Sequence, residues 1–263
     1  MMYTTVKIKE VVMERFSLKG KVAIVTGART GLGQGIALAL AEAGADIVGV
    51  GSTTLDETEK LVMEMGRRFH GITADLRSIK HVDRVISEAV EKMGHVDILV
   101  NNAGIIRRED ALDFSEKDWD DVMDINLKTV FFLSKAAAKQ YIRQGTGGKI
   151  IHIASMLSYQ GGVRVPSYTA SKSGVKGITM AMANEWAKYN ININAIAQGY
   201  MATDNTAALR SDEERSSAIL ERIPADRWGT NEDIGGPAVF LASEASSYMN
   251  GFTIAVDGGW LAR

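Results

Sequence analysis

A tyrosine and a lysine four residues apart, Tyr168 and Lys172, are the side chains of this sequence best suited to moving a proton. If the segment around them is helical, residues at this spacing lie one turn apart on the same face. A neighbouring ammonium favours the ionised phenol and so lowers the pKa of a tyrosine from about 10 towards the working range. The spacing therefore predicts that Tyr168 is a general acid and base for a hydroxyl or carbonyl group.

Ser155 is the third candidate, because it follows a short apolar run and stands thirteen residues before Tyr168. At the carboxyl end of a buried strand, its hydroxyl would lie where ligands bind in open parallel sheets and could bond the same substrate oxygen. Each residue has a purely structural alternative: a tyrosine can pack, a lysine can be solvated and a serine can cap a helix. Their occurrence together with a glycine-rich turn, in the right order, favours catalysis.

The glycine-rich turn comes directly after the first apolar run. Glycines let the backbone turn tightly and approach a pyrophosphate, while free N–H groups at the start of the next helix bind its oxygens. The alternative is a tight connection that binds nothing. No Lys-Ser or Lys-Thr pair follows the last glycine, which excludes a nucleoside-triphosphate loop. The predicted cofactor contacts in this turn are Gly27, Arg29, Thr30, Gly31, Leu32 and Gly33.

The second strand leaves the choice between NAD and NADP open. It ends near residues 50–52 with neither an acid nor a base, whereas an acid there would bond the ribose 2′-hydroxyl of NAD. Arg29 could stack on the adenine or face solvent. Asp75, just after the third strand, could accept a hydrogen bond from the adenine amino group or could cap a helix.

The elements that must position these residues are short β-branched runs alternating with longer segments of helical periodicity. Runs that are apolar at successive positions indicate strands covered on both faces. Repeated strand–helix units with right-handed crossovers make a doubly wound α/β sheet. We predict one such domain over residues 17–263, preceded by a peripheral extension at 1–16. The expected crossover helices are 31–43, 55–67, 78–93, 115–143, 166–189 and 231–242.

The composition excludes several classes of protein. Thirty basic and thirty-two acidic side chains give a net charge of −2, so nothing favours nucleic acid or an anionic membrane. The absence of cysteine excludes disulfides and thiol catalysis. The four histidines are too scattered for a metal site, and His152 is expected to be a satisfied core residue. We expect a cytoplasmic protein with no metal, nucleic-acid or membrane partner.

These residues together resemble the short-chain dehydrogenase/reductase family. The resemblance rests on Thr26–Gly33, Asn101–Gly104, Asn126, Ser155, Tyr168, Lys172 and Asp257–Gly259, and it covers nearly all of 17–263. It implies a single-domain Rossmann fold of roughly seven strands and a nicotinamide cofactor, NAD with NADP not excluded.

The resemblance also implies roles for the site residues. Tyr168 would exchange the proton, Lys172 would bind the nicotinamide ribose, and Ser155 would orient the substrate oxygen. Asn126 would position a water that relays protons from Lys172. The other implied cofactor contacts are Asp75, Leu76, Asn102, Ala103, Gly104, Met201 and Thr203.

Several stretches are similar to the sugar-acid dehydrogenases of this family, namely 107–111, 115–121, 155–158, 160–168 and 184–188. This resemblance implies NAD-linked interconversion of 2-dehydro-3-deoxy-D-gluconate and its 2,5-diketo counterpart, in pectin and hexuronate breakdown, by a homotetramer. A guanidinium can hold a carboxylate with two parallel hydrogen bonds, so we expect Arg108 or Arg164 to anchor the substrate. Gln160 and Ser155 are the further expected substrate contacts. The arginines could equally pair with neighbouring acids or with a cofactor phosphate.

Gln198 departs from the family pattern, which usually has proline at this position. The substitution removes a conformational lock and predicts altered mobility of the loop after the sixth strand rather than lost activity. Two alternative functions keep the same catalytic residues: a gluconate 5-dehydrogenase and a 3-oxoacyl reductase of the same family. A non-enzymatic nicotinamide sensor would need no proton donor, so the intact catalytic set argues against it.

Overall fold

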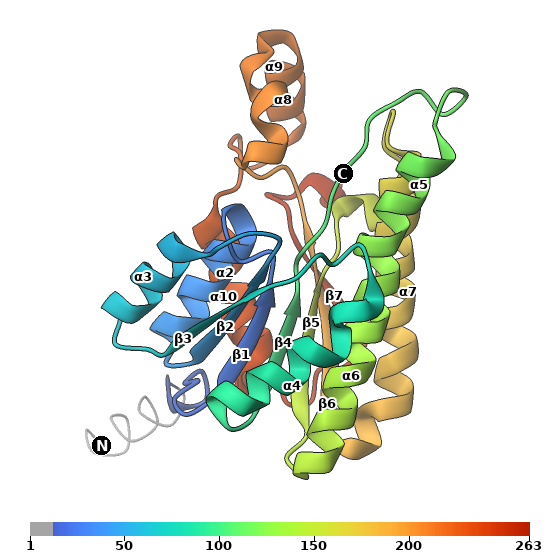
Figure 1. Cartoon of the computed structure of the whole chain (residues 1–263). Coiled ribbons are helices and arrows are strands. Elements are labelled where there is room, and N and C mark those ends of the chain that lie inside the picture. Colours follow the sequence, from blue (N-terminus) through green and yellow to red (C-terminus); the bar gives the residue numbers. More distant parts are fainter. Residues whose placement is uncertain (1–12) are drawn as a thin grey trace, which may run out of the picture.

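The computed structural model describes residues 13–263, apart from the side chain of residue 205. Seven parallel strands form one sheet in the order β3-β2-β1-β4-β5-β6-β7 (Figure 1). The order reverses between β1 and β4, and ligands bind in such sheets beyond the carboxyl ends of the strands at this reversal. The predicted doubly wound sheet is confirmed, whereas the predicted extension at 1–16 lies mostly outside the described residues. The strands are β1 (Val22–Thr26), β2 (Asp46–Gly51), β3 (Phe69–Thr73), β4 (Ile98–Asn101), β5 (Gly148–Ile153), β6 (Ile191–Gln198) and β7 (Thr253–Val256).

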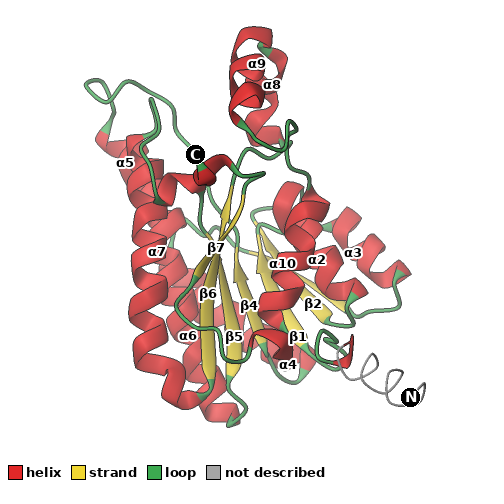
Figure 2. Cartoon of the chain, turned by 180° about the vertical axis from the view of Figure 1, so that it is seen from behind, coloured by secondary structure: helices red, strands yellow, loops and turns green. Residues whose placement is uncertain are grey.

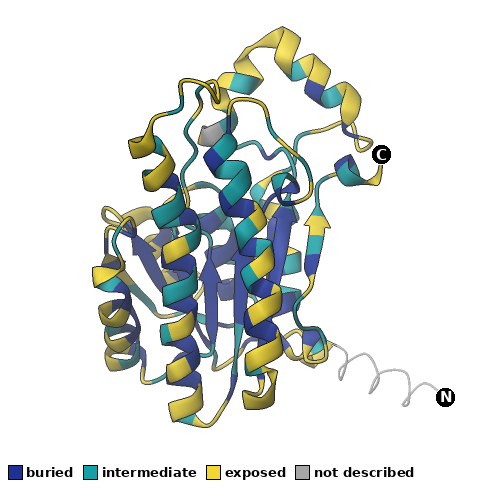
Figure 3. Ribbon diagram, turned by 90° about the vertical axis from the view of Figure 1, so that its right-hand side faces the viewer, coloured by how far each residue is buried: buried dark blue, intermediate teal, exposed yellow. Residues whose placement is uncertain are grey.

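Helices cover both faces of the sheet (Figure 2). One face carries α2 (Gly31–Glu42), α3 (Asp56–Glu64) and α10 (Asn231–Ala242), and the other carries α4 (Val82–Met93), α6 (Thr129–Gln144) and α7 (Pro166–Trp186). Because side chains alternate along a strand, Ile24 packs towards α4 and α6 whereas Val25 packs towards α2 and α10. The central strands are therefore buried, whereas the edge strands β3 and β7 and the outer helix faces meet solvent (Figure 3).

The observed helices differ from the predicted ones in two places. The predicted segment 115–143 is divided into α5 (Glu116–Met123), a π-helical turn (Asp124–Lys128) and α6. After β6, α8 (Ala207–Ser211) and α9 (Glu213–Arg222) form an arm that the sequence did not predict, here called the α8–α9 arm. This arm projects beyond the body of the domain, and most of its surface is exposed (Figures 1 and 3).

His152 lies within β5 and is fully buried, so the expected core role is confirmed. Its ring nitrogens lie 3.0 Å from Ser134 Oγ and 2.9 Å from Thr179 Oγ1. Burial lowers the pKa of His152 from 6.5 to about 3, and the positive charge of Lys172 acts in the same direction. The imidazole is therefore neutral in the folded protein at neutral pH.

This histidine should make the fold sensitive to acid. The unfolded chain takes up a proton on His152 below about pH 6.5, and the folded chain does not. The stability that the neutral ring contributes is complete above that pH and is lost as the pH falls towards 3. We expect this group to lower the free energy of unfolding by about 2 kcal/mol between pH 7 and pH 5, measured by urea titration. His152→Asn should flatten that slope, and equal slopes in the two proteins would contradict the assignment.

Candidate active site

Ser155 follows β5 and begins a short 3-10 turn, Met156–Ser158. Its Oγ accepts a hydrogen bond of 3.1 Å from the Leu157 backbone N–H, so Ser155 caps this turn. Capping uses an acceptor position of the hydroxyl and leaves its proton for another partner. Ser158 Oγ donates to the backbone oxygen of Lys172 over 2.6 Å. The turn that carries Ser155 is thereby fastened to α7.

Tyr168 and Lys172 lie one turn apart near the start of α7, as the spacing predicted. Pro166 occupies the first turn of this helix, where its missing N–H is not needed. Lys172 is 5% exposed, and its Nζ donates to the Ile153 backbone oxygen over 2.5 Å. The same Nζ lies 5.6 Å from the centroid of the Tyr168 ring. An ammonium has three N–H donors, so those not bonded to Ile153 suit the hydroxyls of a ribose.

The pKa of Tyr168 is raised, which corrects the expectation of a lowered value. Burial is the largest cause, and the Ser155 side chain, the Gln198 side chain and the Arg108 charge oppose it. Burial also lowers the pKa of Lys172 to about 8. Desolvation acts against the charged form of both groups, and a sequence spacing does not reveal it. Tyr168 is thus a neutral phenol at neutral pH, able to donate its proton.

Asn126 lies within the π-helical turn and is fully buried. Its side chain joins two segments, since Oδ1 accepts from the Ile105 N–H over 2.9 Å and Nδ2 donates to Ser171 Oγ over 3.2 Å. Ser171 Oγ in turn donates to the Tyr168 backbone oxygen over 2.8 Å. Asn126 therefore positions the first turns of α7, and Ser171 is a partner that sequence reasoning missed. The water relay at Asn126 stays a prediction.

The glycine-rich turn between β1 and α2 is braced by the segment after β4. Thr26 Oγ1 accepts from the backbone N–H groups of Asn102 and Ala103, each over 2.9 Å. Gly27 has a φ of +67°, which favours glycine. A Cβ on Gly33 would lie 2.0 Å from the Gly27 backbone oxygen, so only glycine lets α2 approach the turn.

The amino end of α2 fits an anionic group. The helix start has no side-chain cap, and its first turn holds no acid. Gly31 faces the loop after β6, where a Cβ on this residue would lie 3.8 Å from Thr203 Cγ2. Arg29 and Thr30 are exposed at the same turn, and Leu32 is partly buried. Six predicted contacts thus lie in one cradle that matches the pyrophosphate of a dinucleotide.

Asp75 and Leu76 follow β3 as expected, but Asp75 does not cap a helix. The cap of the next turn is Ser78, and Asp75 instead binds Arg77 with an Nη2–Oδ2 distance of 2.9 Å. Hydrogen bonds from Arg77 lower the pKa of this carboxyl. Leu76 is buried, and its backbone oxygen accepts from Thr129 Oγ1 over 2.7 Å.

The two candidate carboxylate anchors have different surroundings. Both are exposed, and Arg164 has a φ of +62° and lies 3.3 Å from both Glu109 and Asp110. Arg108 acts on the site directly, because its charge opposes the rise in the pKa of both Tyr168 and Tyr200. Which of the two arginines holds a carboxylate stays a prediction.

The α8–α9 arm meets the catalytic region through a small apolar cluster of Met156, Ile219, Ile223 and Trp260. Met156 directly follows Ser155, so the base of the arm rests on the serine turn. Gln160, a predicted substrate contact, accepts a hydrogen bond of 3.4 Å from Arg222 at the end of α9. Arg222 also stacks on Trp260, with its guanidinium carbon 4.0 Å from the ring centroid. Gln160 is thus linked to the arm.

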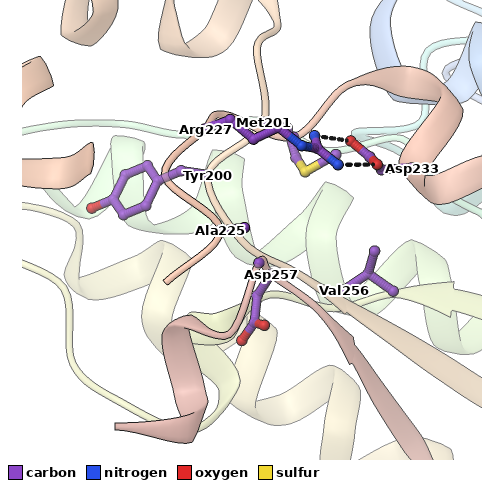
Figure 4. Close-up of a pocket in the computed structure, with 9 residues that line it drawn as sticks. Tyr200, Met201, Ala225, Arg227, Asp233, Val256 and Asp257 are labelled. Carbon is purple, nitrogen blue, oxygen red and sulfur yellow. Dashed lines mark hydrogen bonds and ion pairs between the residues drawn. The ribbon is translucent and has the colours of Figure 1, made fainter. Parts of the chain in front are cut away.

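A cavity of about 70 Å³ lies behind the loop after β6 (Figure 4). Arg227 and Asp233 face one another at its edge and form two hydrogen bonds of 2.7 Å. Met201, a predicted cofactor contact, lines this cavity and is itself buried. None of Ser155, Tyr168 or Lys172 lines it, so the cavity is separate from the proton-transfer residues.

Within residues 13–263, no three acidic or histidine side chains come close enough to hold a metal ion. No helix in this part of the chain combines the length and apolar character needed to cross a membrane.

Known proteins resemble this chain over nearly its whole length. The model of a family described as Enoyl-(Acyl carrier protein) reductase matches residues 27–261. A 2-dehydro-3-deoxy-D-gluconate 5-dehydrogenase of Escherichia coli K12 is 67% identical over 252 residues, which are 96% of this chain and 100% of the relative.

Solved structures agree with this likeness. An Agrobacterium tumefaciens protein with bound NADP has a TM-score of 0.90 and 53% identity, over 95% of this chain and 99% of that one. A gluconate 5-dehydrogenase of Burkholderia cenocepacia J2315, in complex with NADP and tartrate, has a TM-score of 0.91 and 37% identity. That likeness covers 96% of this chain and 99% of the other.

Proposed function

Because the chain belongs to the short-chain dehydrogenase/reductase family, we propose that it oxidises 2-dehydro-3-deoxy-D-gluconate to its 2,5-diketo form, and catalyses the reverse reduction. The observation that carries the proposal is the full-length likeness to a dehydrogenase of this substrate, combined with an intact Ser155–Tyr168–Lys172 set. The breakdown of pectin and hexuronates is the proposed context.

The residues of the site divide the chemistry between them. Tyr168 gives a proton to the substrate carbonyl oxygen in reduction and takes it back in oxidation. Ser155 orients that oxygen through its remaining hydroxyl proton. Lys172 binds the ribose of the cofactor and favours the phenolate by its charge. When bound in the cradle of α2, a nicotinamide dinucleotide supplies or accepts the hydride.

Three arginines act on Tyr200, which packs against the apolar cluster of Met156 next to Ser155, and they favour an anionic substrate. Burial raises the pKa of Tyr200, and the charges of Arg215, Arg222 and Arg108 oppose this rise. Two of these arginines lie in α9, and the third follows β4. A sugar acid carries one carboxylate, which a guanidinium can hold with two hydrogen bonds. We assign Arg108 as the anchor.

Arg108→Ala should raise KM for the sugar acid at least about tenfold, because a charge-assisted hydrogen bond is lost. KM for a neutral ketone should stay nearly unchanged. Arg164→Ala is the matched control, since Arg164 pairs with Glu109 and Asp110 and should affect KM little. The measurement is steady-state kinetics of the three proteins on both substrates. Equal effects of Arg108→Ala on acid and ketone would contradict the assignment.

The direct test of the function is a panel of keto and hydroxy sugar acids, assayed with NAD(H) and NADP(H) in parallel. Both cofactors are tested because β2 ends at Gly51 without a charged side chain that would select between NAD and NADP. We expect the highest kcat/KM for 2-dehydro-3-deoxy-D-gluconate. Activity confined to neutral ketones would remove the sugar-acid assignment, and highest activity on gluconate would favour the gluconate 5-dehydrogenase alternative.

The proposed assembly is a homotetramer. Exposed apolar side chains occur on α5–α7, at Trp119, Ile142 and Met180, and beside β7, at Tyr248 and Phe252. Separate exposed apolar regions favour more than one contact between copies. Sedimentation equilibrium measures the assembly directly. A cytoplasmic location stays a prediction.

A further inference from the structure

Gln198 is the last residue of β6 and lies beside the catalytic residues. It pairs with Val256 of β7 on one side. On the other side, β5 and β6 run in register through Ile153 and Ile196, and the Ala154 N–H donates to the Ile196 oxygen over 2.9 Å. Two residues on, the register therefore brings Gln198 next to Ser155. The Gln198 side chain therefore starts beside Ser155, the residue that is expected to orient the substrate oxygen.

The carbonyl oxygen of the Gln198 side chain is buried, and no donor among the described residues reaches it. A buried acceptor without a partner is unfavourable, and native structures usually satisfy such atoms with protein, water or ligand. The Gln198 side chain also favours ionisation of Tyr168, since it opposes the burial that raises the pKa of this phenol. An amide N–H directed towards the phenol oxygen accounts for that effect and leaves Oε1 available for a ligand.

We propose that Gln198 Oε1 accepts a hydrogen bond from a substrate hydroxyl on a carbon next to the reacting one, and so selects polyhydroxylated acids. The proposal rests on the proposed function, because 2-dehydro-3-deoxy-D-gluconate has hydroxyls on both neighbours of C5. Proline at this position has no side-chain acceptor, so Gln198 gives this chain a contact that the usual family residue lacks.

The test compares Gln198→Met with the wild-type protein on two substrates. Methionine keeps the length of the side chain and removes its hydrogen-bonding groups. The second substrate is 5-hydroxy-2-oxohexanoate, which keeps the carboxylate, the keto group and the C5 hydroxyl and lacks the neighbouring hydroxyls. We expect kcat/KM for the sugar acid to fall about tenfold, the equivalent of one hydrogen bond. For the simpler acid, kcat/KM should fall clearly less than for the sugar acid, because only the effect of the amide on Tyr168 is lost there. The Kd of NADH or NADPH, measured by fluorescence, and Tm should be unchanged.

Equal losses on the two substrates would overturn the proposal, because they would indicate a general structural role. A weakened Kd of the dinucleotide would also overturn it, since the acceptor would then serve the cofactor. Failure of the wild-type protein to turn over any sugar acid would instead remove the proposed function itself. If the wild-type protein is active and Gln198→Met leaves the ratio of the two kcat/KM values unchanged, only the role of Gln198 fails.

Discussion

Tyr168→Phe is expected to lower kcat for the sugar acid by about a thousandfold. Phenylalanine keeps the ring and its packing in α7. It lacks the phenol oxygen, the only atom of the tyrosine side chain that carries an exchangeable proton. The phenol is neutral at neutral pH because burial raises its pKa, so it is the available donor in reduction. In oxidation, the same oxygen must accept the proton of the substrate hydroxyl. The measurement is steady-state kcat in both directions.

The same variant separates an enzyme from a cofactor sensor. The glycine-rich cradle and Lys172 do not depend on the phenol oxygen, so Kd for the dinucleotide should change less than about threefold. Circular dichroism and Tm should match the wild-type protein. Retention of more than about a tenth of the wild-type kcat would show that another group transfers the proton.

Lys172→Met is expected to lower kcat by about a hundredfold at neutral pH. The ammonium is nearly buried, donates to the Ile153 oxygen and lies over the Tyr168 ring. Its removal takes away a positive charge that favours phenolate, so the phenol should titrate at higher pH. The pH profile of alcohol oxidation should therefore shift upward by at least about one unit.

Lys176 provides a matched control for this variant. It lies one turn further along α7, and its Nζ is 3.7 Å from the centroid of another tyrosine ring, that of Tyr159. Lys176→Met removes the same charge from the same helix and should leave kcat and the pH profile unchanged. Similar losses in the two variants would mean that the charge of α7, rather than its position beside Tyr168, is what matters.

The sequence was sufficient for the parts of the fold that depend on local pattern. Successive β-branched residues such as Val22–Val25 identify buried strands, and the spacing of Tyr168 and Lys172 identifies a helical face. It was insufficient where local pattern is weak. The α8–α9 arm is short, charged and mostly exposed, and its two helices bury only Ile219, so the sequence offers few core residues by which to recognise them. The π-helical turn at Asp124–Lys128 interrupts a periodic segment without a proline or glycine to mark it.

The positions of several candidate site residues followed from the sequence, whereas the electrostatics of Tyr168 did not. The turn after Ser155 and the first turns of α7 lie side by side, because Ser158 bonds the Lys172 backbone oxygen and Lys172 bonds the end of β5 at Ile153. The raised pKa of Tyr168 could not be predicted, because desolvation depends on the packing of the folded chain. The position of Gln198 beside Ser155 needed the register of β5 against β6. The partner of Asp75 depended on the Arg77 side chain, whose direction no spacing specifies.

The arm after β6 has a consequence for how such enzymes diversify. The serine turn and α7 are joined to each other by the Ser158 hydrogen bond, whereas the arm contacts this region through a few apolar side chains and the Arg222–Gln160 hydrogen bond at its base. Changes in the length or sequence of the arm should therefore leave the alignment of the serine turn and α7 intact. Substrate specificity could therefore change while the catalytic mechanism is kept. Laboratory evolution of new specificities should begin with residues 207–222.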